Sequence, residues 1–453
     1  MRKFSLVLLV ALVLSLGTSV MAQDKPPGCP EGLWTMMSKE LESACKGEMA
    51  GKVVKMSSTF TGADEAKWND TIAEFEKWTG IDLQYTGSKE FEAAIRAAVE
   101  ANAAPDIADF PQPGLLRDLV LQGKVIDLNT FMNPDWLKQN YKQSWLDMAS
   151  IAGADGKKIM AGIWGKTFGK SQVFYPKAAW DAAGYKVPTT WDELMALSDQ
   201  IVKDGAAPWC VGIESGAATG WPATDWMEEV MLRTTSLENY DNWSFPADAS
   251  KRLPFTSPEV KHAAEVLGDV WFKEGYVYGG REKIVGTNFG DAPTPMFNNP
   301  PDCYMHKQGN FITSFFPKTV TSADYDFFYL PPIDPKYGKP YLVSGDIYAM
   351  FNDRPEVRAF MDFTSRGESM KGWMGAGGAL APMNDAKLEW YTDPIERKVA
   401  QFISEADSVR FDGSDLMPGA VGSGSFWKGM TDWVSGTADL DTVLKEIDAA
   451  WPK

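Results

Sequence analysis

The feature that most constrains the fold is a regular alternation of short apolar runs and amphipathic stretches near the N-terminus. Within the first amphipathic stretch, Trp68, Ile72 and Phe75 recur at the spacing of a buried helical face. Strands that alternate with helices form a largely parallel sheet covered on both faces, so the predicted class is α/β. The expected order is strand, helix, strand, helix, strand over residues 52–60, 64–79, 81–85, 89–103 and 106–110.

The length and charge of the chain indicate how many domains to expect and which class of partner to exclude. At 453 residues the chain exceeds the size that one hydrophobic core usually serves, so we expect two domains. The 44 Lys and Arg against 61 Asp and Glu give a net charge of −17. Nucleic-acid binders depend on clustered basic side chains, so we expect no nucleic-acid partner.

The residue types present favour binding over common catalytic chemistry. The chain has only two histidines, His262 and His306, but 18 Trp, 14 Tyr and 24 Phe. The glycine run 375–378 lacks the Lys-Ser/Thr of a phosphate loop, and no Gly-x-Ser-x-Gly sequence occurs. We therefore expect no cofactor, no metal and no catalytic residues.

The first residues predict export. Arg2 and Lys3 precede the apolar run 4–16, and small residues follow up to Ala22. This order is typical of a cleaved signal peptide, which we place at residues 1–22. No later apolar run is long enough to span a membrane. We expect a soluble exported protein in the periplasm or at the cell surface.

Four cysteines in an exported chain predict two disulfides. Three pairings are possible and the sequence does not choose among them. The expectation adopted here pairs Cys29 with Cys45, in an N-terminal segment at 23–47, and Cys210 with Cys303. A metal site is disfavoured because the chain has no Cys-x-x-Cys sequence.

Several short sequences occur along the chain in an order that resembles one family. They are 57–60, 79–81, 104–107, 125–129, 173–177 and 187–194, the last reading Val-Pro-Thr-Thr-Trp-Asp-Glu-Leu. From about residue 52 onward the chain resembles the extracellular solute-binding proteins of carbohydrate ABC importers, the maltose-binding-protein-like group. The later residues 412–418 and 424–427 are similar to a loop in its α-glucoside and oligosaccharide binders.

The resemblance implies two α/β lobes joined by a hinge of several crossings, with a sugar buried where the lobes close. Carried onto this chain, it implies a first lobe at 48–165 and 295–343 and a second lobe at 166–294 and 344–453. It also implies a monomer that captures an oligosaccharide such as maltose, trehalose or sucrose and delivers it to an ABC-type permease.

A pyranose has apolar C–H faces that suit aromatic rings and a rim of hydroxyls that suits carboxylates and amides. Phe60 and Thr61 follow the first predicted strand, and Asp109 and Gln112 lie at the end of the strand near 106–110. Ligands of open α/β sheets bind at this carboxyl edge. The alternatives are that Phe60 packs inside its lobe and that Asp109 only bonds a turn.

Further candidates lie at the expected hinge crossings. Trp164 and Lys166 follow a glycine in the first of them, where hinge packing and simple solvation are the alternatives. The resemblance implies backbone and polar contacts at Gly345 and Asp346.

The resemblance also places helix starts and a late loop at the cleft. It implies that Trp221, Asp225 and Trp427 contact the ligand. The alternatives are that Asp225 only complements the helix dipole, and that Phe426 makes the late contact or Trp427 packs in the core. Arg410, Asp412 and Asp415 could grip a sugar as a cluster or form a surface ion pair.

Two rival functions remain at this point. An exported glycoside hydrolase could use paired carboxylates such as Asp109 and Asp225. A binding protein for a non-sugar solute, such as a polyamine, would also suit an acidic cleft.

Overall fold

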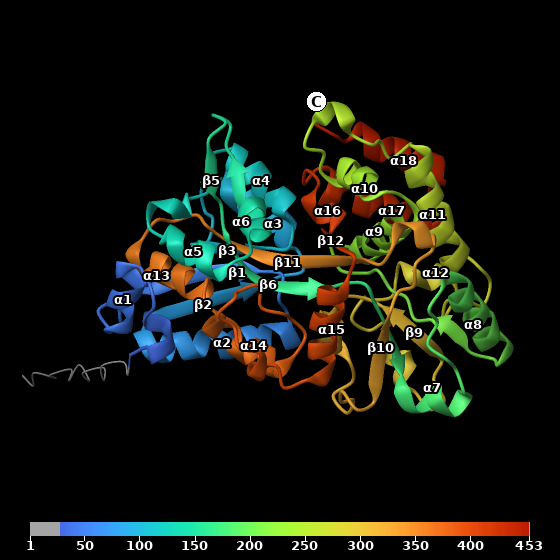
Figure 1. The fold of residues 1–453 in the computed structure, drawn as a ribbon. Coiled ribbons are helices and arrows are strands. Elements are labelled where there is room, and N and C mark those ends of the chain that lie inside the picture. The colour runs from blue at the N-terminus through green and yellow to red at the C-terminus, as the bar shows by residue number, and fades with distance from the viewer. Residues whose placement is uncertain (1–27, 453) are drawn as a thin grey trace, which may run out of the picture.

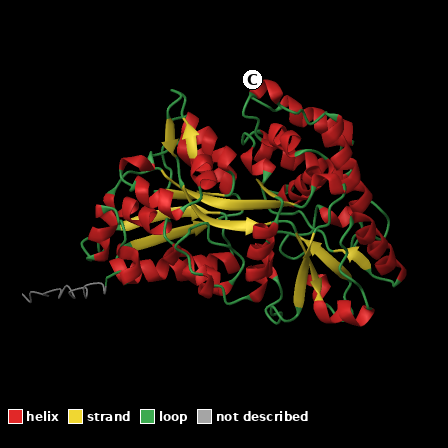
Figure 2. Cartoon of the chain, viewed as in Figure 1, coloured by secondary structure: helices red, strands yellow, loops and turns green. Residues whose placement is uncertain are grey.

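A computed structural model describes residues 28–452, so the predicted signal peptide lies outside the described residues. The chain forms two lobes, each built around its own sheet (Figures 1 and 2). The α/β class predicted from the sequence is confirmed. None of the helices in this range is long and apolar enough to cross a membrane.

The first lobe contains a six-stranded sheet in the order β12-β11-β3-β1-β2, with β6 also paired to β11. β1 is parallel to β2 and β3, whereas β11 runs antiparallel to both β3 and β6. The parallel part is the one that the sequence pattern predicted. The strands are β1 (Val53–Ser58), β2 (Asp82–Gly87), β3 (Ile107–Phe110), β6 (Ile163–Gly169), β11 (Pro340–Met350) and β12 (Ser408–Phe411).

Helices cover both faces of this sheet, and α2 shows why they form. Its residues Trp68, Ile72 and Phe75 are buried, and Gly80 ends the helix in a left-handed conformation at φ 72°. A hairpin of β4 (Ser150–Ala152) and β5 (Lys158–Met160) extends the lobe. The helices are α1 (Lys39–Cys45), α2 (Ala63–Thr79), α3 (Phe91–Glu100), α4 (Pro113–Leu121), α5 (Pro134–Asn140), α6 (Gln143–Ala149), α13 (Pro355–Thr364) and α14 (Lys371–Ala376).

The second lobe contains a four-stranded sheet in the order β10-β7-β9-β8. Its strands are β7 (Gln172–Pro176), β8 (Ala207–Trp209), β9 (Cys303–Lys307) and β10 (Tyr325–Tyr329), and the 3₁₀ helix η5 (Asn310–Phe315) lies between the last two. Its helices are α7 (Lys177–Ala183), α8 (Trp191–Lys203), α9 (Trp221–Thr234), α10 (Leu237–Ser244), α11 (Pro258–Trp271), α12 (Arg281–Ile284), α16 (Gly413–Leu416), α17 (Trp427–Ser435) and α18 (Leu440–Ala449).

The chain passes between the two sheets at β6–β7, β10–β11 and β12–α16. This differs from the expected division at 295–343 and 344–453. β9 and β10 belong to the second sheet, and α13 packs on the first lobe, where Phe360 contacts Trp68 and Phe75. The physical reason is the long strand β11, which pairs with β3 and β6 and so carries the following residues back to the first lobe. α15 (Pro394–Glu405) contacts both β6 and β10 between the lobes (Figure 1).

Both predicted disulfides, Cys29–Cys45 and Cys210–Cys303, are present in the structure. The first closes the N-terminal segment, which packs against α13. There the buried Arg366 donates hydrogen bonds to the carbonyl oxygens of Leu33 and Thr35 at 3.0 and 2.8 Å. The segment before β1 is therefore an integral part of the first lobe.

Candidate ligand-binding site

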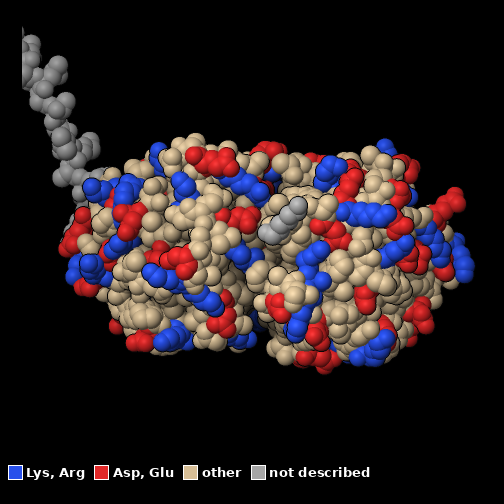
Figure 3. All heavy atoms as spheres, turned by 90° about the horizontal axis from the view of Figure 1, so that it is seen from above, with Lys and Arg blue, Asp and Glu red and all other residues tan. Residues whose placement is uncertain are grey.

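A cavity lined by residues of both lobes lies between them, and its empty space of about 1080 Å³ includes the opening to solvent. The notch between them is visible from above, on a face where acidic and basic side chains are mixed (Figure 3). The first lobe and its strand β6 contribute Thr59, Phe60, Thr61, Asp64, Lys89, Glu92, Pro111, Gln112, Lys166, Phe168, Ser344, Asp346 and Trp373. The remaining lining residues are Lys170, Ser215, Ala218, Trp221, Asp225, Asn288, Phe289, Phe311, Phe315, Ser414, Asp415 and Trp427.

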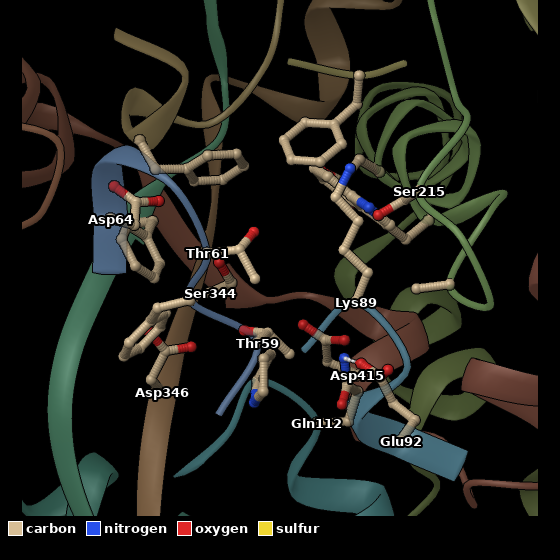
Figure 4. Close-up of a pocket in the computed structure, with 18 of the residues that line it drawn as sticks. Thr59, Thr61, Asp64, Lys89, Glu92, Gln112, Ser215, Ser344, Asp346 and Asp415 are labelled. Carbon is tan, nitrogen blue, oxygen red and sulfur yellow. Dashed lines mark hydrogen bonds between the residues drawn. The ribbon is translucent and has the colours of Figure 1, made fainter. Parts of the chain in front are cut away.

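The carboxyl ends of the parallel strands supply one wall of the cavity, as expected for an open α/β sheet. Phe60 and Thr61 directly follow β1, and Gln112 follows β3. Figure 4 shows Asp64 and Asp346 on the opposite side of the pocket from Lys89 and Ser215, with Gln112 and Asp415 below. The Gln112 amide donates to Glu92 at 3.2 Å, and its Oε1 has no hydrogen-bond partner in the described part of the chain.

Lys166 is fully buried in this wall, and aromatic rings surround its ammonium group. Its Nζ lies 3.1 Å from the ring centroid of Phe60 and 3.7 Å from that of Trp373. The same atom is 3.2 Å from Asp346 Oδ2, but neither atom has a hydrogen-bond partner of suitable geometry within residues 28–452. Burial raises the pKa of Asp346, and the charge of Lys166 opposes this shift. Lys166 Nζ is therefore a buried donor whose hydrogen-bonding capacity the described residues leave unused.

Lys170 bridges two carboxylates in the wall of the cavity that faces Lys166. It donates to Asp225 Oδ1 at 2.8 Å and to Asp412 Oδ2 at 2.5 Å. Burial alone would lower the pKa of Lys170, but these two carboxylates hold it well above its ordinary value. Burial raises the pKa of Asp225 to about 7 against the opposing effect of Lys170, and Asp225 Oδ2 has no partner among the described residues.

The candidate residues that the structure brings together at this cavity are Phe60, Thr61, Gln112, Lys166, Trp221, Asp225, Asp346 and Trp427. Two of them open helices, because Trp221 is the first residue of α9 and Trp427 the first of α17. Trp427 is only 3% exposed, so most of its ring packs in the second lobe.

Two candidates at the first sheet lie behind the cavity. Asp109 is fully buried within β3 and accepts a hydrogen bond from Ser58 at 3.0 Å. Trp164 is 1% exposed, donates to the carbonyl oxygen of Trp145 and packs on Phe411, so it serves the hinge. Neither side chain lines the cavity.

Three later candidates are also held away from the cavity. Gly345 lies inside β11, where a Cβ atom would come within 2.6 Å of the Lys166 carbonyl oxygen. Arg410 forms a two-pronged ion pair with Asp241 at 2.6 and 2.9 Å. Asp412 caps α16 and binds Lys170, so it acts behind the wall.

Some cavity residues carried no signal that the sequence analysis recognised. Trp373 lies on the short helix α14. Its position in the sequence looks like that of an apolar residue on the buried face of a helix. Phe311 and Phe315 belong to η5, a segment without a strand end or helix start to mark it. Lys170 lies next to the first crossing, and its position there was the one available signal.

The comparisons with known proteins agree with this architecture. The profile of the family described as bacterial extracellular solute-binding protein matches residues 70–402. The chain belongs to this family. It is a solute-binding protein rather than an enzyme, and the resemblance inferred from the sequence is confirmed.

Two relatives align over nearly the whole chain. The osmoprotective compounds-binding protein GgtB of Synechocystis is 40% identical over 90% of this chain and 94% of its own length. The α-glucosides-binding periplasmic protein AglE of Rhizobium meliloti is 39% identical over 91% of this chain and 90% of its own. The solved structure of the bacterial solute receptor AcbH superposes with a TM-score of 0.74 at 16% identity, covering 88% of this chain and 98% of the receptor. That likeness confirms the two-lobed fold.

Proposed function

We propose that this protein binds an oligosaccharide, an α-glucoside such as maltose, trehalose or sucrose, between its lobes and delivers it to the permease of an ABC importer. The observation that carries the proposal is the lining of the cavity. Aromatic rings and buried polar atoms without protein partners face one space from both lobes. The names of the two relatives, one binding α-glucosides and one osmoprotective compounds, support the ligand class.

The proposed contacts follow from the chemistry of a pyranose. Trp221 offers a half-buried ring face for C–H groups, because its ring is held edge-on by Phe289. Gln112 and Asp225 each present an unpartnered oxygen that can accept from sugar hydroxyls. Lys166, in the same wall as Gln112, can donate to a sugar hydroxyl. A sugar bonded to residues of both lobes favours their closed arrangement, which a permease can recognise.

The proposal also covers the cellular setting. Membership of an extracellular family and a periplasmic relative support delivery from outside the inner membrane. The signal peptide at residues 1–22 and the monomeric state are part of the same proposal.

Calorimetric titration of the protein without residues 1–22 tests the function. Maltose, trehalose, sucrose and spermidine are titrated separately, and at least one of the sugars is expected to bind with one site per chain. Asp225→Asn is expected to weaken that binding at least tenfold, because a charged hydrogen-bond acceptor is lost. Asp241→Asn, on the surface beside Arg410, serves as the matched control and should bind normally.

Two results would count against the proposal. One is binding of spermidine together with no heat from any sugar. The other is release of glucose from the sugars during the titration, which would indicate hydrolysis.

A further inference from the structure

Five aromatic side chains form a continuous row along the cavity. Neighbouring ring centroids in the row are 5.4, 5.8, 5.0 and 5.1 Å apart. The rings come from β6, η5, the start of α9 and the loop after α12, so the row joins segments that are far apart in the sequence. In spatial order they are Phe168, Phe311, Trp221, Phe289 and Phe315.

Two polar groups that neighbour Phe289 and Phe315 in the sequence are already bonded to the protein. The amide of Asn288 donates to Glu214 at 2.6 Å and accepts from the backbone N–H of Gly290 at 3.0 Å. The hydroxyl of Ser314 accepts from Lys67 at 2.5 Å. Four of the five rings are nevertheless only half buried. The end of the row at Phe289 and Phe315 therefore presents apolar faces next to polar groups that are already bonded.

The free hydrogen-bonding capacity of the cavity lies nearer the other end of the row, where Lys166 Nζ is 5.9 Å from the ring centroid of Phe168. The buried side-chain oxygen and nitrogen atoms of the lining without partners in the range 28–452 include Asp64 Oδ1, Gln112 Oε1, Lys166 Nζ, Asp225 Oδ2 and Asp346 Oδ2. Trp221 connects this group to the row, since Lys170 Nζ, which binds Asp225, lies 5.5 Å from its ring centroid. The free polar atoms thus lie near Phe168 and Trp221 and form the polar part of the cavity, and Phe289 and Phe315 form its aromatic end.

The two parts suit two halves of one ligand. A pyranose has hydroxyls around its whole rim, and leaving them unpaired in a closed site lowers affinity. We infer that the cavity selects a glycoside with an apolar aglycone, whose sugar ring occupies the polar part while an aryl or alkyl group stacks on the aromatic row. This inference rests on the proposed function, because it assumes a sugar in the polar part.

Calorimetry with 4-nitrophenyl α-D-glucopyranoside, methyl α-D-glucopyranoside and maltose tests the inference. The nitrophenyl glucoside is expected to bind about tenfold more tightly than the methyl glucoside, the gain typical of aromatic stacking plus burial. Replacing Phe315 with leucine should remove most of this preference, because the flat ring face at the end of the row is lost. The affinity for methyl α-D-glucopyranoside should stay within about twofold, which also shows that the variant is folded. Tyr278→Leu, at an exposed aromatic outside the cavity, is the matched control.

The possible results distinguish failure of this inference from failure of the proposed function. Binding of maltose or the methyl glucoside without any preference for the nitrophenyl group overturns the inference and leaves the proposed function standing. A preference that persists in Phe315→Leu also overturns it. If none of the three sugars binds, the proposed function fails and the inference fails with it.

Discussion

At the scale of single residues, two buried lysines on neighbouring positions of the crossing β6–β7 are stabilised in different ways. Lys170 bonds two carboxylates, whereas Lys166 is held between the rings of Phe60 and Trp373. An ammonium group loses its hydration on burial, so each lysine needs a compensating interaction. Lys166 obtains it from Asp346, whose Oδ2 lies 3.2 Å from its Nζ, and from the two ring faces.

The Lys170 ion pairs should dominate the stability of the cavity wall. Lys170→Met leaves Asp225 and Asp412 buried without a cation, so we expect the free energy of unfolding to fall by about 3–5 kcal/mol. Urea denaturation followed by tryptophan fluorescence measures the change. Arg410→Ala breaks a partly exposed ion pair and should cost about 0–1 kcal/mol. Equal losses in the two variants would contradict this assignment.

The burial of Glu396 should make the stability of the protein depend on pH. Burial raises its pKa to about 7, although the Gly378 N–H and the Asn310 amide donate to its carboxylate. The folded form then holds the proton more tightly than the unfolded form, so this residue makes the free energy of unfolding fall as pH rises from about 4.5 to 7. Between pH 5 and 8 the contribution is about 2–3 kcal/mol.

The measurement is urea denaturation of the protein and of Glu396→Gln at pH 5 and 8. The variant is less stable at both pH values because its amide N–H₂ faces another donor. Its free energy of unfolding should fall less between pH 5 and 8 than that of the unchanged protein, by about 2–3 kcal/mol. Identical decreases in the two proteins would rule out Glu396 as the source.

At the scale of elements, local sequence signals predicted the parallel strands β1, β2 and β3 of the first sheet. They did not predict how the later strands join that sheet. β1, α2, β2, α3 and β3 follow from apolar spacing and from stop residues such as Gly80. β11 could not be placed this way, because its partners β3 and β6 are about 170 to 240 positions earlier in the chain and pairing leaves no local pattern.

The same distinction explains the candidate site. Phe60, Thr61 and Gln112 follow strand ends, which a sequence pattern marks. Phe311 and Phe315 reach the cavity only because η5 packs beside β6, a contact that depends on the folded chain. Residues positioned by tertiary packing were therefore the ones that sequence reasoning missed.

The start of α8 gives a test at this scale. Thr190 accepts from the Glu193 N–H at 3.2 Å, and the Glu193 carboxylate accepts from the Thr190 N–H at 3.2 Å, forming a capping box. Thr190→Ala is expected to lower the free energy of unfolding by about 1 kcal/mol. Thr190→Ser keeps the hydroxyl and should recover most of this loss. Chemical denaturation compares the three proteins, and an unaffected alanine variant would contradict the role of the cap.

At the scale of the whole molecule, Lys170 links all three crossings between the lobes. Lys170 lies between β6 and β7, and its backbone N–H donates to the carbonyl oxygen of Leu342 on β11 at 2.8 Å. Its side chain binds Asp412, which follows β12. Its bond to Asp225 extends the same network to α9 at the cavity. The hinge and the candidate ligand-binding wall therefore share one residue, so a ligand that contacts Asp225 also contacts the hinge network.

The two disulfides should contribute unequally to the stability of this assembly. Cys210–Cys303 spans 93 residues and Cys29–Cys45 spans 16, and a longer closed loop restricts the unfolded chain more strongly. In the loop-entropy model the losses are about 4.7 and 3 kcal/mol for loops of these approximate lengths. The double alanine variants, compared by urea denaturation, should therefore differ by about 1–2 kcal/mol. Because Cys29–Cys45 secures a segment packed on α13 rather than a cavity wall, its removal should leave sugar affinity unchanged at temperatures where the protein stays folded. A loss of affinity in that variant would mean that the N-terminal segment supports the cavity through the first lobe.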